Sequence, residues 1–243
     1  MDTVALRIIV GIITTTLFST SCVAIENRTR PDQVMAINIL LEPDENMIRH
    51  VTENNALLRK AYPEGFSLDA AHTPHMTLVQ CFVRSKDLKK VYAGVKKALG
   101  RTHVKAIQLE AYKYYYYVPS GPIGLAGIVA RPTTELLKLQ ADIVASVAPY
   151  TVDIGDSSSF ITTKEDPVID PVLIRYVATF VSNQTGEHFS PHVSTGVALK
   201  EDLDELLARP FQKFTFYPTG AAVYQIGQLG AAATKLQGLK LQQ

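Results

Sequence analysis

Hydrophobic and polar positions alternate along the chain with two distinct periods, which predicts a mixed α and β protein. Short runs rich in Val, Ile, Leu and Tyr predict strands, and apolar residues that recur every three or four positions predict amphipathic helices. The predicted strands cover residues 34–41, 75–83, 104–118, 124–130 and 191–199, with a closing hairpin over 214–229. The predicted helices cover residues 44–61, 86–99, 132–147 and 201–208, while residues 170–181 fit a helix and a strand almost equally well.

Capping chemistry marks several ends of these segments. Asp44, which follows a proline, and Ser85 each stand before a predicted helix and offer a side-chain oxygen to its first turn. Gly100 follows the last apolar residue of the second helix and predicts its end.

The order of predicted elements occurs twice. Each half reads strand, helix, strand with a Pro-His start, helix and hairpin, which predicts an internally duplicated α+β unit. We therefore expect residues 25–243 to form one bilobal domain, with lobes at roughly 34–118 and 124–235. Residues 149–190 have no counterpart in the first half and are interpreted as an insertion.

The charge balance limits the ligands of the protein. The 243 residues include 24 Lys and Arg against 23 Asp and Glu, and 47% are hydrophobic, which excludes a disordered chain. Long duplex nucleic acid is bound by a basic surplus that this chain lacks. A nucleic-acid ligand would be a small nucleotide or a short RNA end held in a local pocket.

The N-terminus has the pattern of an export signal. Residues 8–18 are an uncharged apolar run after Arg7, and small residues ending at Ala24 follow. We interpret residues 1–24 as a signal peptide of a secreted or periplasmic protein. A retained membrane anchor is the alternative, because residues 8–25 reach the lower edge of a membrane span. A lipid-modified Cys22 is a third, weaker interpretation.

Two nearly matching strings contain the candidate chemistry. TPHMT (73–77) and SPHVS (190–194) each place a histidine and a hydroxyl two residues apart. Side chains on a strand alternate between its faces, so His75 shares a face with Thr77, and His192 with Ser194. Two imidazoles supply a general base and a general acid, and two hydroxyls can hold phosphoryl oxygens. The pattern predicts attack on a phosphodiester.

These strings resemble the signature of the two-histidine phosphoesterases, the group of cyclic phosphodiesterases and bacterial 2′-5′ RNA ligase-like proteins. That signature is His-hydrophobic-Thr/Ser-hydrophobic, used twice. Residues 75–78 match it in full, and residues 192–195 match it except at Thr195, where an apolar residue is usual. Residues 223–230 are also similar to the closing strand of that family.

The resemblance implies a bilobal α+β fold, with two antiparallel sheets flanked by helices around a central cleft. It implies cleavage of 2′,3′-cyclic or 2′-5′ phosphodiester bonds of nucleotides or short RNA without a metal or other cofactor. His75 and His192 would be the catalytic residues, and Thr77 and Ser194 would bind the phosphate. We expect a monomer.

Three other interpretations stay open. His72, His75, His188 and His192 have spacings that resemble zinc ligands, although a proline inside each span disfavours the helix that such spacing needs. The fold could also serve as a non-catalytic module that binds nucleotides or protein. Tyr112 and residues 114–117 place rings on both faces of one strand, where they either stack a base or pack across strands.

Overall fold

The computed structural model describes residues 32–164 and 166–241. Its strands are β1 (Val34–Pro43), β2 (Met76–Arg84), β3 (Leu109–Ser120), β4 (Ile123–Ala130), β5 (Thr151–Val152), β6 (His192–Leu199), β7 (Phe214–Phe216), β8 (Pro218–Ile226) and β9 (Ala232–Leu239). Its α-helices are α1 (Glu45–Ala61), α2 (Leu88–Leu99), α3 (Thr134–Val147), α4 (Pro171–Ala178), α5 (Phe180–Asn183) and α6 (Lys200–Ala208). The expected α+β class is confirmed.

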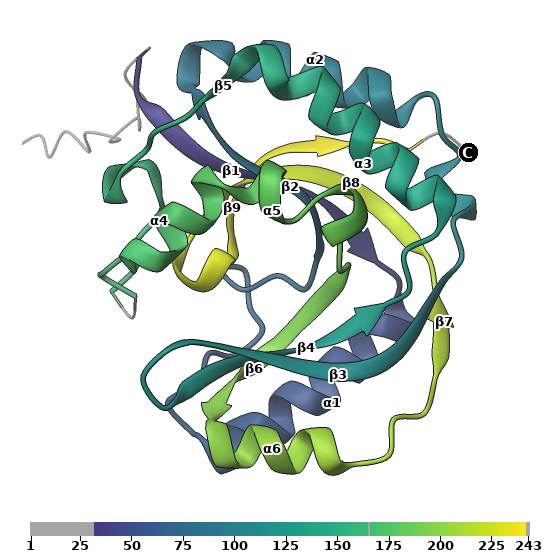
Figure 1. Cartoon of the computed structure of the whole chain (residues 1–243), viewed down its shortest axis with the longest axis vertical. Helices are drawn as coiled ribbons and strands as arrows, with labels where there is room; N and C mark the ends of the chain where they lie inside the picture. Colours follow the sequence, from purple (N-terminus) through teal and green to yellow (C-terminus); the bar gives the residue numbers. More distant parts are fainter. Residues whose placement is uncertain (1–31, 165, 242–243) are drawn as a thin grey trace, which may run out of the picture.

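The strands form one curled antiparallel sheet, which corrects the expectation of two separate sheets (Figure 1). The order is β7-β3-β4-β6-β2-β1-β8-β9, and β5 pairs with β2. Between β6 and β2 the pairing consists of one residue pair, Met76 with Val193. A half of four strands, β7-β3-β4-β6, and a half of five, which includes β5, therefore meet at this pair. The pattern of one strand does not reveal its pairing partner, so a sequence cannot distinguish this sheet from two sheets that face each other.

The order strand, helix, strand, helix is present twice, but the first repeat ends in the single strand β3 where a hairpin was predicted. Each half of the sheet contains strands from both halves of the chain. β3, which ends the first repeat, pairs with β4 of the second repeat. β8, near the end of the second repeat, pairs with β1 of the first. Each half of the sheet is thus built from both repeats, and the chain crosses from one half to the other to build them.

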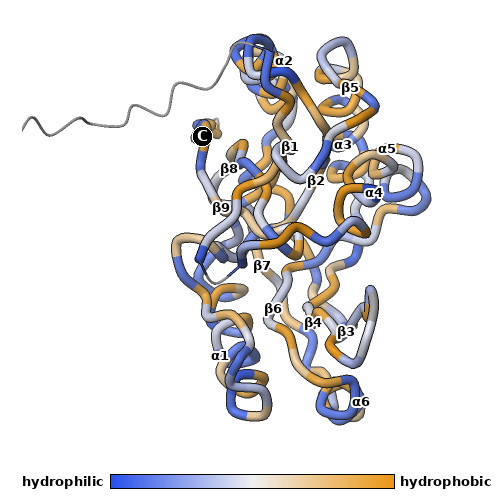
Figure 2. Tube along the Cα trace, turned by 90° about the vertical axis from the view of Figure 1, so that its left-hand side faces the viewer, coloured by the Kyte–Doolittle hydropathy of each residue, from blue (hydrophilic) through white to orange (hydrophobic). Residues whose placement is uncertain are grey.

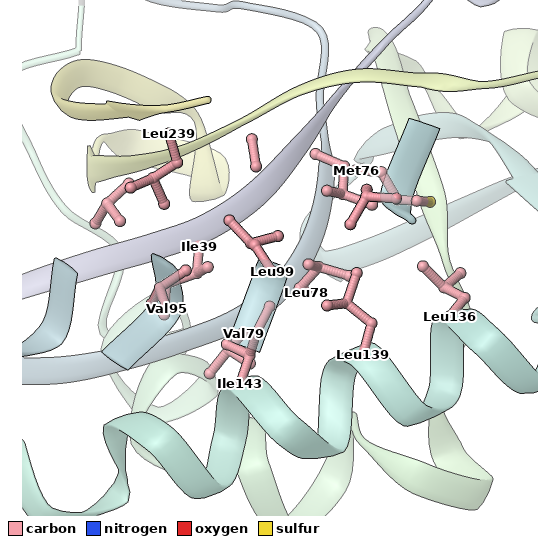
Figure 3. Close-up of a cluster of buried hydrophobic side chains, with 14 of the residues drawn as sticks. Ile39, Met76, Leu78, Val79, Val95, Leu99, Leu136, Leu139, Ile143 and Leu239 are labelled. Carbon is pink, nitrogen blue, oxygen red and sulfur yellow. The ribbon is translucent and has the colours of Figure 1, made fainter. Parts of the chain in front are cut away.

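The main core lies between the sheet and the paired helices α2 and α3. These helices lie side by side over β1, β2 and β9, and Figure 3 shows their apolar side chains meeting those of the strands. Leu139 and Ile143 of α3 reach Leu78 and Val79 of β2, and all four are fully buried. Burial of this area is the main driving force for the fold.

The other helices cover the remaining parts of the sheet. α1 packs on β6, and α6 packs on β3, β4 and β6, at the opposite end of the molecule from α2 and α3. Hydrophobic and hydrophilic residues alternate along these helices in Figure 2, as expected for helices with one buried face. The insertion (149–190) contributes α4 and α5, which contact β2, and Phe160, which meets Phe82 edge to face at 5.8 Å.

Local capping agrees with most of the predicted ends. The Asp44 carboxylate accepts a hydrogen bond from the Met47 amide at 3.1 Å and caps α1, and Gly100 ends α2. α2 begins at Leu88, after a single 3₁₀ turn at Ser85–Asp87, and so later than predicted. The ambiguous segment begins as the helix α4, because the Asp170 side chain accepts from the Val172 amide at 2.7 Å and Pro171 fits the first turn.

The predicted signal peptide (1–24), with Cys22, lies outside the described residues. Among the described helices, none is long and apolar enough to cross a membrane.

Candidate functional site

A pocket of about 430 Å³ lies at the junction of the two halves of the sheet. His75 and Thr77 at the start of β2, and His192 and Ser194 at the start of β6, all line it. The remaining wall comes from β3, from the insertion and from the turn between β8 and β9. The structure therefore brings the four predicted site residues together, while their catalytic roles stay a prediction.

The pairing of Met76 with Val193 explains why these four side chains gather. Both paired side chains are buried, at 1% exposure each, on the core side of the sheet. Their neighbours on either side of the pair must point the other way, into the pocket. One register pair thus sets two histidines and two hydroxyls on one surface.

A pairing irregularity follows each motif at the corresponding place. The register of β1 with β2 shifts just beyond Thr77, and that of β4 with β6 shifts just beyond Ser194. A bulge places an additional residue on one strand and changes which face the later residues occupy. The two half-sites are therefore built alike around their hydroxyls.

His75 is held by two hydrogen bonds that define its tautomer. Its Nδ1 donates to the Thr73 carbonyl oxygen at 2.7 Å, so Nε2 has the lone pair when the ring is neutral. The amide Nδ2 of Asn38, on β1, donates to that Nε2 at 3.1 Å and to Thr77 Oγ1 at 3.0 Å. Asn38 is fully buried, and its Oδ1 has no hydrogen-bond partner. One amide thus positions both members of the first motif.

His192 is oriented in the same way but has different neighbours. Its Nδ1 donates to the Ser190 carbonyl oxygen at 2.8 Å. The ring of Tyr115, on β3, meets the His192 ring edge to face at 4.7 Å, and its hydroxyl lies near Ser194. Gly127 of β4 makes this possible, because a Cβ there would lie 2.5 Å from Tyr115 Cε1.

The two half-sites differ at one corresponding strand position. On β1, Asn38 lies two residues before the residue that pairs with Thr77. On β4, the residue two positions before the partner of Ser194 is Leu125, which also lines the pocket. The first imidazole therefore has a buried amide donor, where the second has a leucine.

Burial lowers the pKa of both histidines. It lowers the pKa of His75 to about 4, although the Thr73 carbonyl acts in the opposite direction, and the nearby His192 lowers it further. Burial also lowers the pKa of His192, against the opposing effect of the Ser190 carbonyl. Both rings are therefore neutral at pH 7 in the free protein, since an ordinary imidazole has a pKa near 6.5.

The zinc interpretation is not supported by the arrangement of side chains. Within residues 32–164 and 166–241, no group of three or more His, Cys, Asp or Glu side chains could hold a metal ion. His72 instead stacks on Phe66 at 4.5 Å, and its Nδ1 lies 3.3 Å from an oxygen of Asp69. His188 lies in an exposed 3₁₀ turn of the insertion. The four histidines do not converge on one ligand set.

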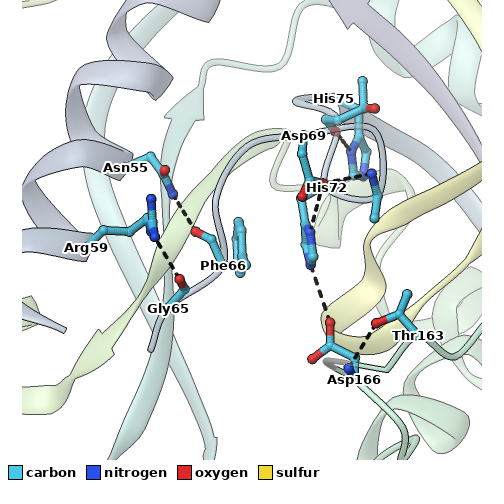
Figure 4. Close-up of polar contacts among 11 residues, drawn as sticks. Asn55, Arg59, Gly65, Phe66, Asp69, His72, His75, Thr163 and Asp166 are labelled. Carbon is cyan, nitrogen blue, oxygen red and sulfur yellow. Dashed lines mark hydrogen bonds and ion pairs between the residues drawn. The ribbon is translucent and has the colours of Figure 1, made fainter. Parts of the chain in front are cut away.

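His72 lies outside the two motifs and contacts the insertion, as Figure 4 shows. Its Nε2 lies 3.7 Å from an oxygen of Asp166, so it joins the loop before β2 to the insertion. The same loop is tied to α1 by Asn55, which donates to the Phe66 carbonyl at 3.0 Å. These contacts fix the segment that leads into His75.

The tyrosines of β3 fall into two groups: some line the pocket, and others pack on neighbouring side chains. Tyr115, Tyr116 and Tyr117 line the pocket. Tyr112 is covered by the Arg131 guanidinium, 4.3 Å from its ring centre, and Tyr114 packs edge to face on Phe211 at 4.7 Å. Packing is therefore confirmed for Tyr112 and Tyr114, while stacking of a base by the rings that line the pocket stays a prediction.

Sequence reasoning missed Asn38, Tyr115 as a partner of His192, and the need for Gly127. Only Asn38 left a usable signal: it is the one polar residue in the apolar run VMAINILL (34–41). A buried amide in such a run needs a hydrogen-bond partner, which points to a site.

No protein-family model matches the chain, and no curated protein matches it. Among solved structures, TT0787 of Thermus thermophilus is similar over 85% of this chain and 98% of its own, with 16% identity and a TM-score of 0.51. Escherichia coli LigT complexed with 3′-AMP is similar over 87% and 99%, with 15% identity and a TM-score of 0.46. Usb1 of Kluyveromyces marxianus is similar over 87% and 99%, with 10% identity and a TM-score of 0.42.

At 16% identity, the likeness to TT0787 shows a shared fold and nothing about activity, and the two lower scores add nothing to it. The resemblance to two-histidine phosphoesterases, drawn from the motifs, is thereby confirmed at the level of the fold.

Proposed function

We propose that the protein is a phosphodiesterase that cleaves 2′,3′-cyclic or 2′-5′ phosphodiester bonds of nucleotides or short RNA ends. The observation that supports this most is the joint position of His75, Thr77, His192 and Ser194 on one pocket wall. Both imidazoles donate from Nδ1 to a backbone carbonyl, so Nε2 is the atom of each ring that would transfer a proton.

In this proposal His75 is the general base for the attacking water. Its low pKa keeps it neutral, and the Asn38 amide already donates to its Nε2, the atom that must accept the proton. A water that replaces Asn38 at Nε2 gives its proton there while its oxygen attacks phosphorus. Asn38 keeps its second N–H on Thr77 meanwhile.

His192 is then the general acid. The strand position that corresponds to Asn38 is Leu125 beside His192, so no amide donor there opposes protonation of its Nε2. As the new P–O bond forms, the bond from phosphorus to the ribose oxygen breaks, and Nε2–H gives its proton to that oxygen. The base gains one proton and the acid loses one, so the net charge of the pair is unchanged.

Thr77 and Ser194 hold the phosphoryl oxygens in this arrangement. The hydroxyls lie beside the two imidazoles on the same wall; Thr77 accepts from Asn38, and Ser194 lies near the Tyr115 hydroxyl. Hydrogen-bond donors that are positioned before the reaction stabilise the charge that develops on those oxygens.

A panel of substrates tests the proposal. The purified protein should hydrolyse 2′,3′-cyclic mononucleotides or 2′-5′-linked dinucleotides in a chromatographic assay. Calorimetry with the corresponding nucleoside monophosphates measures binding in parallel. Binding without turnover of any member of the panel would contradict the proposal and favour the non-catalytic binding module.

We also propose that residues 1–24 direct export, as the apolar run and the small residues before Ile25 suggest. Expression of the full chain followed by N-terminal sequencing tests this. Secreted or periplasmic material that begins near Ile25 supports export with cleavage. An intact Met1 in the membrane fraction would show a retained anchor instead.

A further inference from the structure

The positive charge of the chain is concentrated on and around α2. Residues 84–105 contain eight of the 24 Lys and Arg residues and one acidic residue, although the net charge of the whole chain is only +1. Six of these cations are exposed on α2 and in the segment that follows it, and we call them the basic face: Lys89, Lys90, Lys96, Lys97, Arg101 and Lys105. The insertion (149–190) has the opposite balance, with six Asp and Glu against one Lys and one Arg.

The basic face is not explained by stabilisation of the fold. Among the described residues, only Lys90 of this face forms an ion pair, with Asp87 at 2.8 Å. Lys96 and Lys97 suit the last turn of α2, because the C-terminal end of a helix has a negative partial charge. Lys89 lies in the first turn, where that partial charge is positive and where α2 has no acidic residue. A cation kept at an unfavourable position points to a partner outside the domain.

The basic face lies on the side of the sheet opposite to the pocket. α2 packs on the sheet through the main core, whereas the two histidine motifs and the insertion form the pocket on the other side (Figure 1). Among the described residues that line the pocket, none is Lys or Arg. An anionic partner of the basic face is therefore separate from the ligand of the pocket.

The start of the described chain lies beside the basic face. Asp32 forms an ion pair at 2.6 Å with Lys86, which stands just before α2. The chain before Asp32 includes the apolar run 8–18, and the 13 residues between the two (19–31) span at most about 45 Å when fully extended. A membrane that holds the apolar run is thus within reach of α2, which favours lipid as the anionic partner.

We propose that the basic face docks the domain on an anionic lipid surface, with the pocket on the side that faces away from the membrane. Each Lys or Arg close to such a surface raises the affinity by about fivefold through its attraction to the lipid headgroups. The acidic insertion is repelled by the same lipids, so the charges of the domain select one orientation. This inference does not depend on the proposed catalysis.

Sedimentation with vesicles tests the proposal on the chain from Ile25, which contains every described element and lacks the apolar run. Thermal unfolding shows that this chain is folded. Vesicles of phosphatidylcholine mixed with phosphatidylglycerol should bind it about tenfold or more tightly than phosphatidylcholine alone at about 0.1 M salt. The difference should disappear at about 1 M salt, where the screening length is only about 3 Å. Equal binding to both vesicles at low salt would overturn the proposal.

Charge reversal locates the docking surface. Lys96→Glu combined with Lys97→Glu should weaken binding to the mixed vesicles by roughly 30-fold or more, because two attractive contacts are lost. Lys60→Glu combined with Arg209→Glu is the matched control, since it makes the same change in net charge at exposed positions that end α1 and α6. Those helices lie at the opposite end of the molecule from α2 (Figure 1). An equal loss in both double variants would contradict docking through α2.

Lys89→Glu separates docking from stability. A carboxylate in the first turn of α2 is favourable for the helix, so the unfolding temperature should stay the same or rise. Binding to the mixed vesicles should nevertheless fall by about fivefold or more. Unchanged vesicle binding in this folded variant would contradict a docking role for the basic face.

Fluorescence polarisation with a labelled single-stranded RNA covers the other anionic partner. We expect the unaltered protein to bind the mixed vesicles, with a dependence on Lys96 and Lys97 that its RNA binding does not share. RNA binding that is lost in the Lys96→Glu and Lys97→Glu variant, together with equal binding to neutral and mixed vesicles, would show that the basic face is an RNA surface and overturn the lipid proposal.

Discussion

At the scale of single residues, the two half-sites are similar in their motifs and different in what supports them. Asn38 donates to His75 and Thr77, while the corresponding strand position beside His192 is Leu125. A donor aimed at Nε2 favours the neutral ring, and on this asymmetry the proposed mechanism gives the base role to His75. Two groups whose surroundings separate their proton affinities can divide the work of acid and base.

The pH profile tests this division. Activity needs His75 neutral and His192 protonated, so kcat/KM should be bell-shaped, with an acid limb near pH 4 and an alkaline limb below pH 6.5. Asn38→Asp should move the acid limb up by about one to three pH units, because a carboxylate stabilises the imidazolium and raises the pKa of His75. The measurement is kcat/KM from pH 3 to 9.

Asn54→Asp is the control for that variant, since it makes the same change at a buried asparagine of α1 that does not line the pocket. Thermal unfolding of both variants shows whether the fold survives. Asn38→Leu, which copies the second half-site, removes the donor that favours the neutral ring, so it should lower kcat and move the acid limb up by less than Asn38→Asp does. An acid limb that stays in place in Asn38→Asp would show that Asn38 does not control His75.

At the scale of elements, the close approach of β3 and β4 determines the surroundings of His192. Gly127→Ala would place a Cβ 2.5 Å from Tyr115 Cε1 and 2.9 Å from the Val193 carbonyl oxygen, so the Tyr115 ring must move. We expect a loss of stability of about 1–3 kcal/mol and a kcat lowered by roughly tenfold or more, because the displaced Tyr115 ring disturbs the position of His192 and Ser194. Denaturant unfolding and steady-state kinetics measure the two effects.

Gly238→Ala in β9 provides the comparison, because a Cβ there meets only the Lys235 side chain at 3.5 Å. That variant should retain both stability and kcat. If Gly127→Ala behaves like it, the Tyr115 contact has no role in the site.

Sequence patterns predict elements better than they predict pairing. The alternation rule placed His75 with Thr77 and His192 with Ser194, and the capping residue Asp44 located the start of α1. The single joined sheet and the exchange of β3 and β8 depend on contacts between distant segments, which leave no period in the sequence. For the same reason Tyr115 could not be assigned to His192: their contact follows from the pairing of β3 with β4 and β4 with β6.

At the scale of the whole molecule, the pocket is formed by segments that lie far apart in the sequence. β1 contributes Asn38, the middle strands contribute the histidines, and the insertion covers the same face through α4 and α5. His72 and its contact with Asp166 join the loop before His75 to the insertion. The candidate site residues and the insertion that lines the pocket are therefore supported by one continuous sheet, which favours a site that is formed before a ligand binds.

The most direct test of the proposed catalysis is steady-state turnover of adenosine 2′,3′-cyclic phosphate by His75→Ala, His192→Ala and the double variant, with and without EDTA. Each single variant should lose roughly 10²–10⁴ of kcat, the usual worth of one positioned proton-transfer group. The double variant should lose less than the product of the two, because the residues act as a unit. The unaltered protein should keep its activity in EDTA. Full activity of either single variant, or activity that is lost in EDTA and restored by zinc, would contradict catalysis by the two histidines.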